Sequence, residues 1–169
     1  MVDKKLDGAG LRGQVAGETA LCTVGKSGTG LTYRGLDISV LADNAKFEEI
    51  AYLLLRGQLP KQEELDSYIN NIKGLRDLPQ ALKDVLERIP ASTHPMDVMR
   101  TGCSMLGNLE PESSFDQQDE IIDRLLATMP SIICYWYCYS HEDKRIDTAL
   151  DDDSIGAHFL HMLLSLIHI

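Results

Sequence analysis

Three side chains near the end of the chain have the types and spacing that could hold a metal ion. Cys134, Cys138 and His141 lie three or four residues apart, so a helix would place them on one face, and His158 or His161 could add a further ligand. Zinc takes about four nitrogen or sulfur ligands in tetrahedral geometry. However, the C-x-x-C spacing of closed zinc sites is absent, and aromatic residues fill the interval. We therefore interpret both cysteines as buried packing residues, as free cysteine usually is.

A glycine-rich stretch, Ala20 to Ser27 (ALCTVGKS), differs at one position from the phosphate-binding pattern G-x-x-x-x-G-K-[ST]. Ala20 stands where the pattern has its first glycine. That pattern binds phosphate when it leads into a helix, because the loop amides and the helix N-terminus then face the anion. Here the next segment is extended, and Gly28 and Gly30 prolong the turn. The context favours a β-hairpin loop over a nucleotide site.

The remaining acid-base candidates have structural interpretations. His94 precedes Pro95 at an expected helix start, where a neutral imidazole can hydrogen-bond the backbone; a catalytic role would need a partner that shifts its pKa. Adjacent carboxylates point in different directions on a helix, so they favour solvated surface or first-turn caps over a facing acid-base pair. These carboxylates are Glu48-Glu49, Glu63-Glu64 and Asp151 to Asp153, and Met96, Met99 and Met105 are interpreted as core residues.

Length and composition exclude several classes of protein. The 169 residues suffice for one core, and 44% apolar residues are typical of a globular chain. No apolar run approaches the roughly 20 residues that cross a bilayer, and the first 13 residues lack the pattern of a targeting peptide, so we expect a cytoplasmic protein with no membrane partner. A net charge of −10 argues against nucleic-acid binding. Cys22, Cys103, Cys134 and Cys138 are expected to be reduced and buried.

The elements that must position these side chains centre on residues 31–60. Two short strands are expected around the glycine-rich turn, at 21–24 and 31–34. Asp37 can cap a short helix from Ile38 to Ala42. The next helix has an almost continuous apolar run from Ile50 to Leu55, so it must lie inside a protein, and Gly57 is expected to end it.

Helical periodicity continues through the rest of the chain. Stripes of apolar residues predict further helices around 65–75, 82–89 and 96–106, with a loop at 109–118. A long helix kinked at Pro130 should follow. After a charged loop, Asp152 or Asp153 can cap a last helix whose apolar face includes Phe159. The expected fold is all-α, a helical array with one short N-terminal β-hairpin.

Several of these stretches resemble the citrate synthase family, in its 2-methylcitrate synthase branch. The resemblance runs from about Gly10 to Leu164. It implies the N-terminal part of the large domain at 13–164, a flexible arm at 1–12 and an atypical tail at 165–169. The stretches that carry it are TYRG-D, FEEIAYLLL-G-LP, HPMDVMRTG, Thr19 to Gly28, Tyr135 to His141 and Asp151 to Leu160.

The resemblance implies an acyltransferase that joins propionyl-CoA to oxaloacetate in propionate breakdown, with a homodimer as the complete enzyme and no bound cofactor. A carboxylate would deprotonate the acyl group while histidines stabilise the reacting carbonyl oxygens. The family's histidine motifs EH-x-N and GHP are absent, so we assign no catalytic, cofactor-binding or metal-binding residue, and His94, His141, His158, His161 and His168 receive no role.

We therefore expect an incomplete and inactive piece of a synthase that exposes apolar faces and is poorly soluble. Plain citrate synthase, acting on acetyl-CoA, and a non-catalytic helical module that pairs with an intact subunit remain as alternatives.

Overall fold

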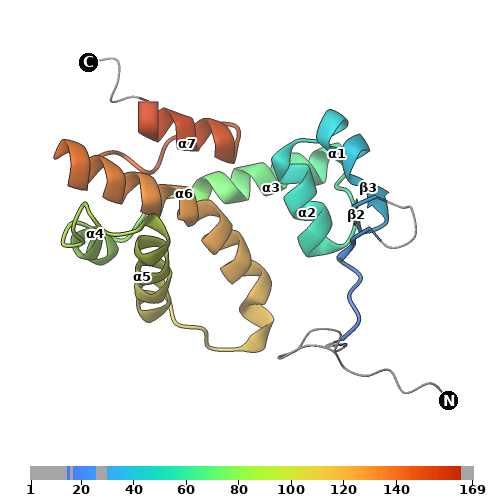
Figure 1. Cartoon of the computed structure of the whole chain (residues 1–169), viewed down its shortest axis with the longest axis horizontal. Helices are drawn as coiled ribbons and strands as arrows, with labels where there is room; N and C mark the ends of the chain where they lie inside the picture. The colour runs from blue at the N-terminus through green and yellow to red at the C-terminus, as the bar shows by residue number, and fades with distance from the viewer. Residues whose placement is uncertain (1–14, 16, 26–29, 165–169) are drawn as a thin grey trace, which may run out of the picture.

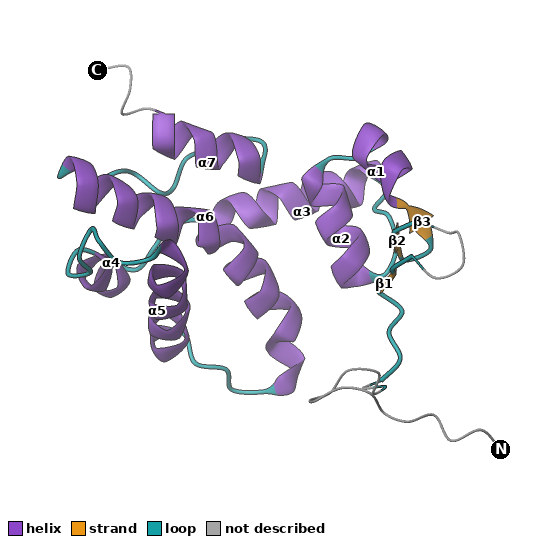
Figure 2. Cartoon of the chain, in the orientation of Figure 1, coloured by secondary structure: helices purple, strands orange, loops and turns teal. Residues whose placement is uncertain are grey.

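The computed structural model describes residues 15, 17–25 and 30–164. The expected arm at 1–12 and tail at 165–169 lie outside these residues. The described part is mostly helical, with a small sheet at one end (Figure 2). In chain order its elements are β1 (Cys22–Thr23), β2 (Thr32–Tyr33), β3 (Leu36–Asp37), α1 (Ile38–Asn44), α2 (Phe47–Arg56), α3 (Gln62–Gly74), α4 (Gln80–Leu86), α5 (Pro95–Leu109), the 3-10 turn η1 (Phe115–Gln117), α6 (Gln118–Glu142) and α7 (Ile155–Leu164).

The sheet extends the expected hairpin by one strand. β1 pairs with β2 in antiparallel register, Cys22 opposite Tyr33, as the glycine-rich turn predicts. β2 then pairs with β3 through a tight turn at Arg34 and Gly35, both with positive φ. Glycine adopts that conformation readily, whereas Arg34 must be held there. Its guanidinium donates to the Leu54 carbonyl at 2.8 Å, which ties the sheet to α2.

Helix boundaries near the sheet follow the expected capping. The Asp37 carboxylate accepts a hydrogen bond from the Ser39 amide at 2.8 Å, so the predicted cap is confirmed. α1 continues to Asn44, beyond the expected end at Ala42. Gly57 ends α2 with a φ of 90°, the left-handed conformation that favours glycine.

α6 is the helix against which α3, α4, α5 and α7 pack (Figure 1). The main core lies between α4, α5 and α6, and a smaller cluster joins α3 to α6. The buried members of the main core are Leu78, Leu82, Leu86, Val98, Leu106, Ile132, Tyr135 and Trp136. The centre of packing is therefore α6 and not the stretch at 31–60 that the sequence emphasises.

The long helix kinked at Pro130 is confirmed as one element. α6 runs through 25 residues with Pro130 inside it, and Figure 1 shows the ribbon changing direction midway. Proline removes one backbone hydrogen bond and crowds the preceding turn, which allows the bend. The bend lets the first half of α6 face α2 while the second half packs against α7 and α5.

The predicted apolar stripe of α5 is partly wrong. Met96 is 69% exposed, whereas Val98, Gly102 and Leu106 are buried against α6. The stripe is rotated because Gly102, with no side chain, lets the two helices approach closely: a Cβ there would lie 2.5 Å from Cγ2 of Ile132. Counting apolar residues alone overlooks a glycine at a helix crossing.

The start of α7 also differs from expectation. Neither Asp152 nor Asp153 caps it; the Ser154 hydroxyl accepts from the Ala157 amide at 3.0 Å. α6 continues to Glu142, so the charged loop begins later than expected. α7 buries His158 and Met162, while the expected face residue Phe159 is 36% exposed.

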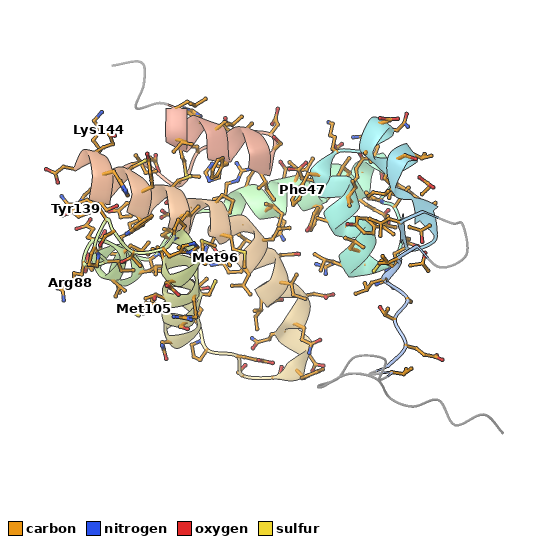
Figure 3. The ribbon with its side chains drawn as sticks, viewed as in Figure 1. Phe47, Arg88, Met96, Met105, Tyr139 and Lys144 are labelled. Carbon is orange, nitrogen blue, oxygen red and sulfur yellow. The ribbon has the colours of Figure 1, made fainter. Side chains whose placement is uncertain are left out.

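α2 is less buried than its apolar sequence predicts. Of its apolar residues only Leu53 is fully buried, and Phe47 is 55% exposed. Figure 3 labels Phe47 on α2. Within the described residues no helix combines the length and apolar character needed to span a bilayer.

Candidate functional site

The histidines singled out in the sequence lie apart from one another, except for two. His94 caps α5 by accepting from the Met96 amide at 3.2 Å, so its predicted structural role is confirmed. His141 is exposed and stacks on Tyr137 at a ring separation of 4.5 Å. His168 lies outside the described residues. Among the four histidines that the structure describes, only His158 and His161 come together, both beside Asp152.

A cluster of buried polar residues holds the junction of α2, α3, α6 and α7. We call it the junction cluster; its members are Glu48, Arg76, Ser131, Asp152 and His158. All but Asp152, which is half-buried, are at most 2% exposed. Buried polar groups of this kind stabilise a fold only when they are hydrogen-bonded, so their partners decide what the cluster can do.

Two members of the cluster tie the start of α7 to distant helices. The Glu48 carboxylate accepts from the Ile155 amide at 2.8 Å, which satisfies a free N–H in the first turn of α7. Arg76 donates through Nη1 to the carbonyls of Leu150 and Asp152, at 3.0 and 2.7 Å. Burial lowers the pKa of Arg76, although neighbouring carboxylates oppose that shift. These contacts fix the loop that leads into α7.

His158 lies at the centre of the cluster. Its Nε2 is 3.2 Å from the Ser131 hydroxyl, and its Nδ1 is 3.8 Å from the Asp152 carboxylate, with no hydrogen-bond partner among the described residues. Burial, helped by the positive charge of Arg76, lowers the pKa of His158 to about 4. The imidazole is therefore neutral at pH 7.

Ser131, His158 and Asp152 are the residue types of a nucleophilic triad. Their arrangement in this structure excludes that chemistry. Both Ser131 and His158 have zero exposure, so no substrate can reach the hydroxyl. The 3.8 Å gap to Asp152 exceeds a hydrogen bond, and an imidazole with so low a pKa is a weak base at pH 7. The cluster holds the start of α7 in place and lacks the geometry of a nucleophilic triad.

The two cysteines of α6, Cys134 and Cys138, are packing residues. The thiols of Cys134 and Cys138 point to carbonyls of α7 at 3.9 and 3.8 Å, and burial raises the pKa of Cys134 to about 12. No group of three metal-ligating side chains occurs in the part of the chain that the structure describes. Cys22 and Cys103 are only partly buried, so the expectation of four buried thiols is wrong for these two.

The phosphate-loop alternative also lacks its structural context. Val24 and Gly25 leave β1, and the chain returns as β2, which is a strand and not a helix. Residues 26–29 lie outside the described part. The hairpin interpretation is confirmed by the pairing of the flanking strands.

The adjacent acidic residues have two different roles, which the sequence does not distinguish: some cap their own helix, and Glu48 binds another helix. Glu49 and Glu64 accept from the amides at the starts of their own helices, at 2.8 and 2.7 Å, as predicted for first-turn caps. Glu48 was expected there or in solvent and instead is buried, serving α7. The sequence around Glu48 gives no sign of this role, because its partner at the start of α7 is 107 residues away and local periodicity does not identify distant partners.

A partly buried ion pair between α2 and α6 was not anticipated. Arg56 donates to both oxygens of the Asp123 carboxylate at 2.8 and 2.9 Å, and Asn71 of α3 adds a contact of 3.3 Å. Burial raises the pKa of Asp123, while Arg56 opposes the shift. The pair joins three helices and leaves neither charge free for a ligand.

Three cavities between helices of the described part of the chain could hold a ligand. One of about 470 Å³ lies between α5 and α6, but its Arg124 guanidinium is already bound to Glu110 at 2.7 and 2.9 Å. A second, of about 570 Å³, lies between α6 and α7 and is mostly aromatic and aliphatic. The third, of about 410 Å³, lies between α2 and α6 and has only apolar residues in its lining. None brings convergent free polar groups to a ligand.

The family model and the relatives that match this chain are all citrate synthases or related proteins. Residues 10–166 match a family model described as citrate synthase, C-terminal domain. A 2-methylcitrate synthase of Shewanella oneidensis is 70% identical over 160 residues, which are 95% of this chain and 43% of that relative. A citrate synthase-related protein of Dictyostelium discoideum is 39% identical over 150 residues, or 88% of this chain and 36% of that protein.

A solved structure shares the fold. The crystal structure of citrate synthase from Thermotoga maritima matches with a TM-score of 0.78 at 27% identity, covering 98% of this chain and 42% of that one. The chain thus spans less than half the length of these relatives. Because the family model matches nearly all of it, the chain belongs to the citrate synthase family.

Proposed function

We propose that this chain forms the N-terminal portion, with residues 13–164 as part of the large domain, of a 2-methylcitrate synthase. That enzyme would condense propionyl-CoA with oxaloacetate and water to give 2-methylcitrate and CoA. The observation that carries the proposal is the 70% identity to the Shewanella oneidensis 2-methylcitrate synthase over 95% of the chain. The identity to the Thermotoga maritima citrate synthase, by contrast, is 27%.

In this proposal the chain contributes scaffold and not chemistry. The junction cluster, the Arg56–Asp123 pair and the core around α6 are structural contacts, and we assign none of their members to the reaction. The chain alone is then inactive. The complete enzyme would be a cytoplasmic homodimer that acts in propionate breakdown and needs no bound cofactor.

Citrate synthase activity on acetyl-CoA is the second candidate. The two acyl groups differ by one carbon, and a hydrophobic pocket distinguishes one methylene by only about 1–3 kcal/mol. Some activity with both substrates is therefore expected from the complete enzyme. A helical module that pairs with an intact subunit is a further alternative, supported by the apolar groove between α2 and α6.

A chimera tests the proposal. Residues 10–164 would replace the aligned residues of the Shewanella oneidensis 2-methylcitrate synthase, and condensation would be measured by CoA release with propionyl-CoA and with acetyl-CoA. We expect activity within about tenfold of the parent and the same acyl preference, because a scaffold with 70% identity should support the same active site.

The isolated 169-residue chain is the matched control, and we expect no CoA release from it. A chimera that folds but condenses neither substrate would refute the proposal. So would condensation by the isolated chain, because the chain would then contain the active site that we place elsewhere.

A further inference from the structure

α7 packs chiefly against one other helix. Figure 1 shows it along α6, with α4 and α5 on the opposite side of that helix. Of the ten residues of α7 only His158 and Met162 are buried. A peripheral helix with few buried side chains opens at a lower free energy than the helices of the core. The closed position of α7 therefore depends on how well its buried histidine is accommodated.

The groups around His158 favour its neutral form. They belong to the helices that meet at the junction and to the loops beside them: Glu48 of α2, Arg76 after α3, Ser131 of α6, Asp152 before α7 and His161 of α7 itself. The Ser131 hydroxyl can donate or accept, so it stabilises neither charge state of the ring. Arg76 is buried and positively charged, so it repels a second positive charge.

The carboxylate nearest to His158 among the described residues already has another partner. The oxygens of Asp152 lie 3.1 and 3.2 Å from Nδ1 of the half-exposed His161, and 3.8 Å separates Asp152 from Nδ1 of His158. The second separation is longer than a hydrogen bond. Glu48 is also engaged, by the Ile155 amide at 2.8 Å. A proton on His158 in the closed structure would therefore lack a hydrogen-bonded carboxylate.

Proton binding by His158 is consequently linked to the opening of α7. Burial and Arg76 lower the pKa of His158 to about 4, whereas an imidazole in water has its ordinary value of 6.5. The open form binds the proton more readily, so opening is favoured as the pH falls from about 6.5 toward 4. Between pH 7 and pH 5 the open population rises roughly twentyfold. Carboxyl groups ordinarily titrate below this window, at about pH 4.

We propose that α7 is a proton-dependent latch: a proton taken up by His158 releases this helix from α6 while the core of α4, α5 and α6 stays folded. The face of α6 that is released carries Cys134 and Cys138, whose thiols point to carbonyls of α7 at 3.9 and 3.8 Å in the closed form. The proposal uses only contacts within this chain, so it is independent of the reaction proposed for the complete enzyme.

The two thiols of α6 report the opening. The 169-residue chain would be treated with 4,4′-dithiodipyridine, which forms mixed disulfides with thiols in mildly acidic solution, and peptide mass spectrometry would give the labelling rates from pH 7 to pH 5. Cys103 is the internal reference, because it is partly exposed on α5 and lines a cavity that includes no residue of α7. Below their pKa values all thiols lose thiolate by the same factor, so the ratio of rates isolates the opening.

We expect the labelling rate of Cys134 and Cys138, divided by that of Cys103, to rise roughly twentyfold from pH 7 to pH 5. His158→Gln can still hydrogen-bond Ser131 and cannot take up a proton, so its ratio should stay constant to within about twofold. His141→Gln is the matched control, because His141 is an exposed histidine outside the junction cluster, and the full rise should remain.

Urea distinguishes the release of α7 from unfolding of the whole chain. The dependence of an opening reaction on urea scales with the surface that it exposes. At pH 5 the labelling of Cys134 and Cys138 should therefore have less than about half the urea slope of global unfolding, which the buried Trp136 reports. Both measurements on the unsubstituted chain test the latch even if His158→Gln does not fold.

Three results would overturn the proposal. A urea slope equal to that of global unfolding would show that the core opens together with α7. A ratio that changes by less than about threefold between pH 7 and pH 5, or that rises equally in His158→Gln, would show that His158 does not control the opening. Slower labelling at pH 5 would show that Asp152 turns from His161 to a protonated His158 and tightens the closed form.

Discussion

Replacing Gly102 by alanine tests the close crossing of α5 and α6. The added Cβ would lie 2.5 Å from Cγ2 of Ile132, whereas carbon atoms pack at about 3.5–4.0 Å. Ile132 has zero exposure, and its Cγ2 sits directly on a branched Cβ, so it cannot turn away without leaving its rotamer. Either the helices separate by about 1 Å or Ile132 is strained.

The magnitude follows from two opposing terms. Overpacking a close-packed core costs about 1–3 kcal/mol, and exchanging glycine for alanine inside a helix gains about 1 kcal/mol. Gly107→Ala is the matched control, because it lies on the same helix, is exposed and would place its Cβ within 4 Å of nothing. We expect Gly107→Ala to stabilise the protein and Gly102→Ala to be about 1–3 kcal/mol less stable than it.

Urea unfolding followed by the fluorescence of Trp136 is the assay. Trp136 is the only tryptophan and is 2% exposed in the core that Ile132 shares, so it reports on this crossing. Adding Ile132→Ala removes the clashing methyl group, and in that background Gly102→Ala should no longer destabilise. Equal free energies of unfolding for the two alanine variants would show that α5 and α6 do not meet at Gly102.

Three other predictions use the same unfolding assay or a labelling experiment. The pKa of His158 is about 4 in the folded protein and 6.5 in the unfolded chain, so the unfolded chain binds the proton more readily. The free energy of unfolding should therefore decrease by roughly 3 kcal/mol as the pH falls from about 6.5 to about 4, and His158→Asn should lose that part of the pH dependence. Arg56→Met should destabilise by about 3–5 kcal/mol at pH 7, since it leaves the buried Asp123 carboxylate unpaired, and a change below 1 kcal/mol would contradict the pairing. Iodoacetamide at pH 8 should label the partly exposed Cys22 in the folded chain, and should label Cys134, whose pKa is about 12, only after urea unfolds it. Labelling of Cys134 in the folded chain, detected by peptide mass spectrometry, would contradict this.

The sequence predicts the local features of this fold well because their causes are local. Asp37 caps α1, Gly57 ends α2 and Pro130 bends a continuous helix, each through groups within a few residues of one another. Motif resemblance likewise identified the family. These features depend on backbone conformation and nearby hydrogen bonds, which short patterns encode.

The features that the sequence did not predict depend on contacts between distant segments. Met96 has the spacing of a core residue, yet the glycine at 102 rotates the buried face of α5 away from it. Glu48 resembles a surface acid and is buried because α7 begins against it. His158 becomes a buried neutral imidazole only when Arg76 and Ser131 close around it. Periodicity cannot show which face meets which partner.

The hydrogen bond between Glu48 and Ile155 joins residues 107 positions apart, and this separation has a consequence for biosynthesis. When α2 leaves the ribosome, the amide that its carboxylate will bind has not yet been made. Until α7 is translated, Glu48 must stay hydrated, so this face of α2 cannot close early. The nascent chain therefore completes this junction only after α7 is made, and a chain that terminates before codon 155 has an unpaired acid where the fold requires a buried one.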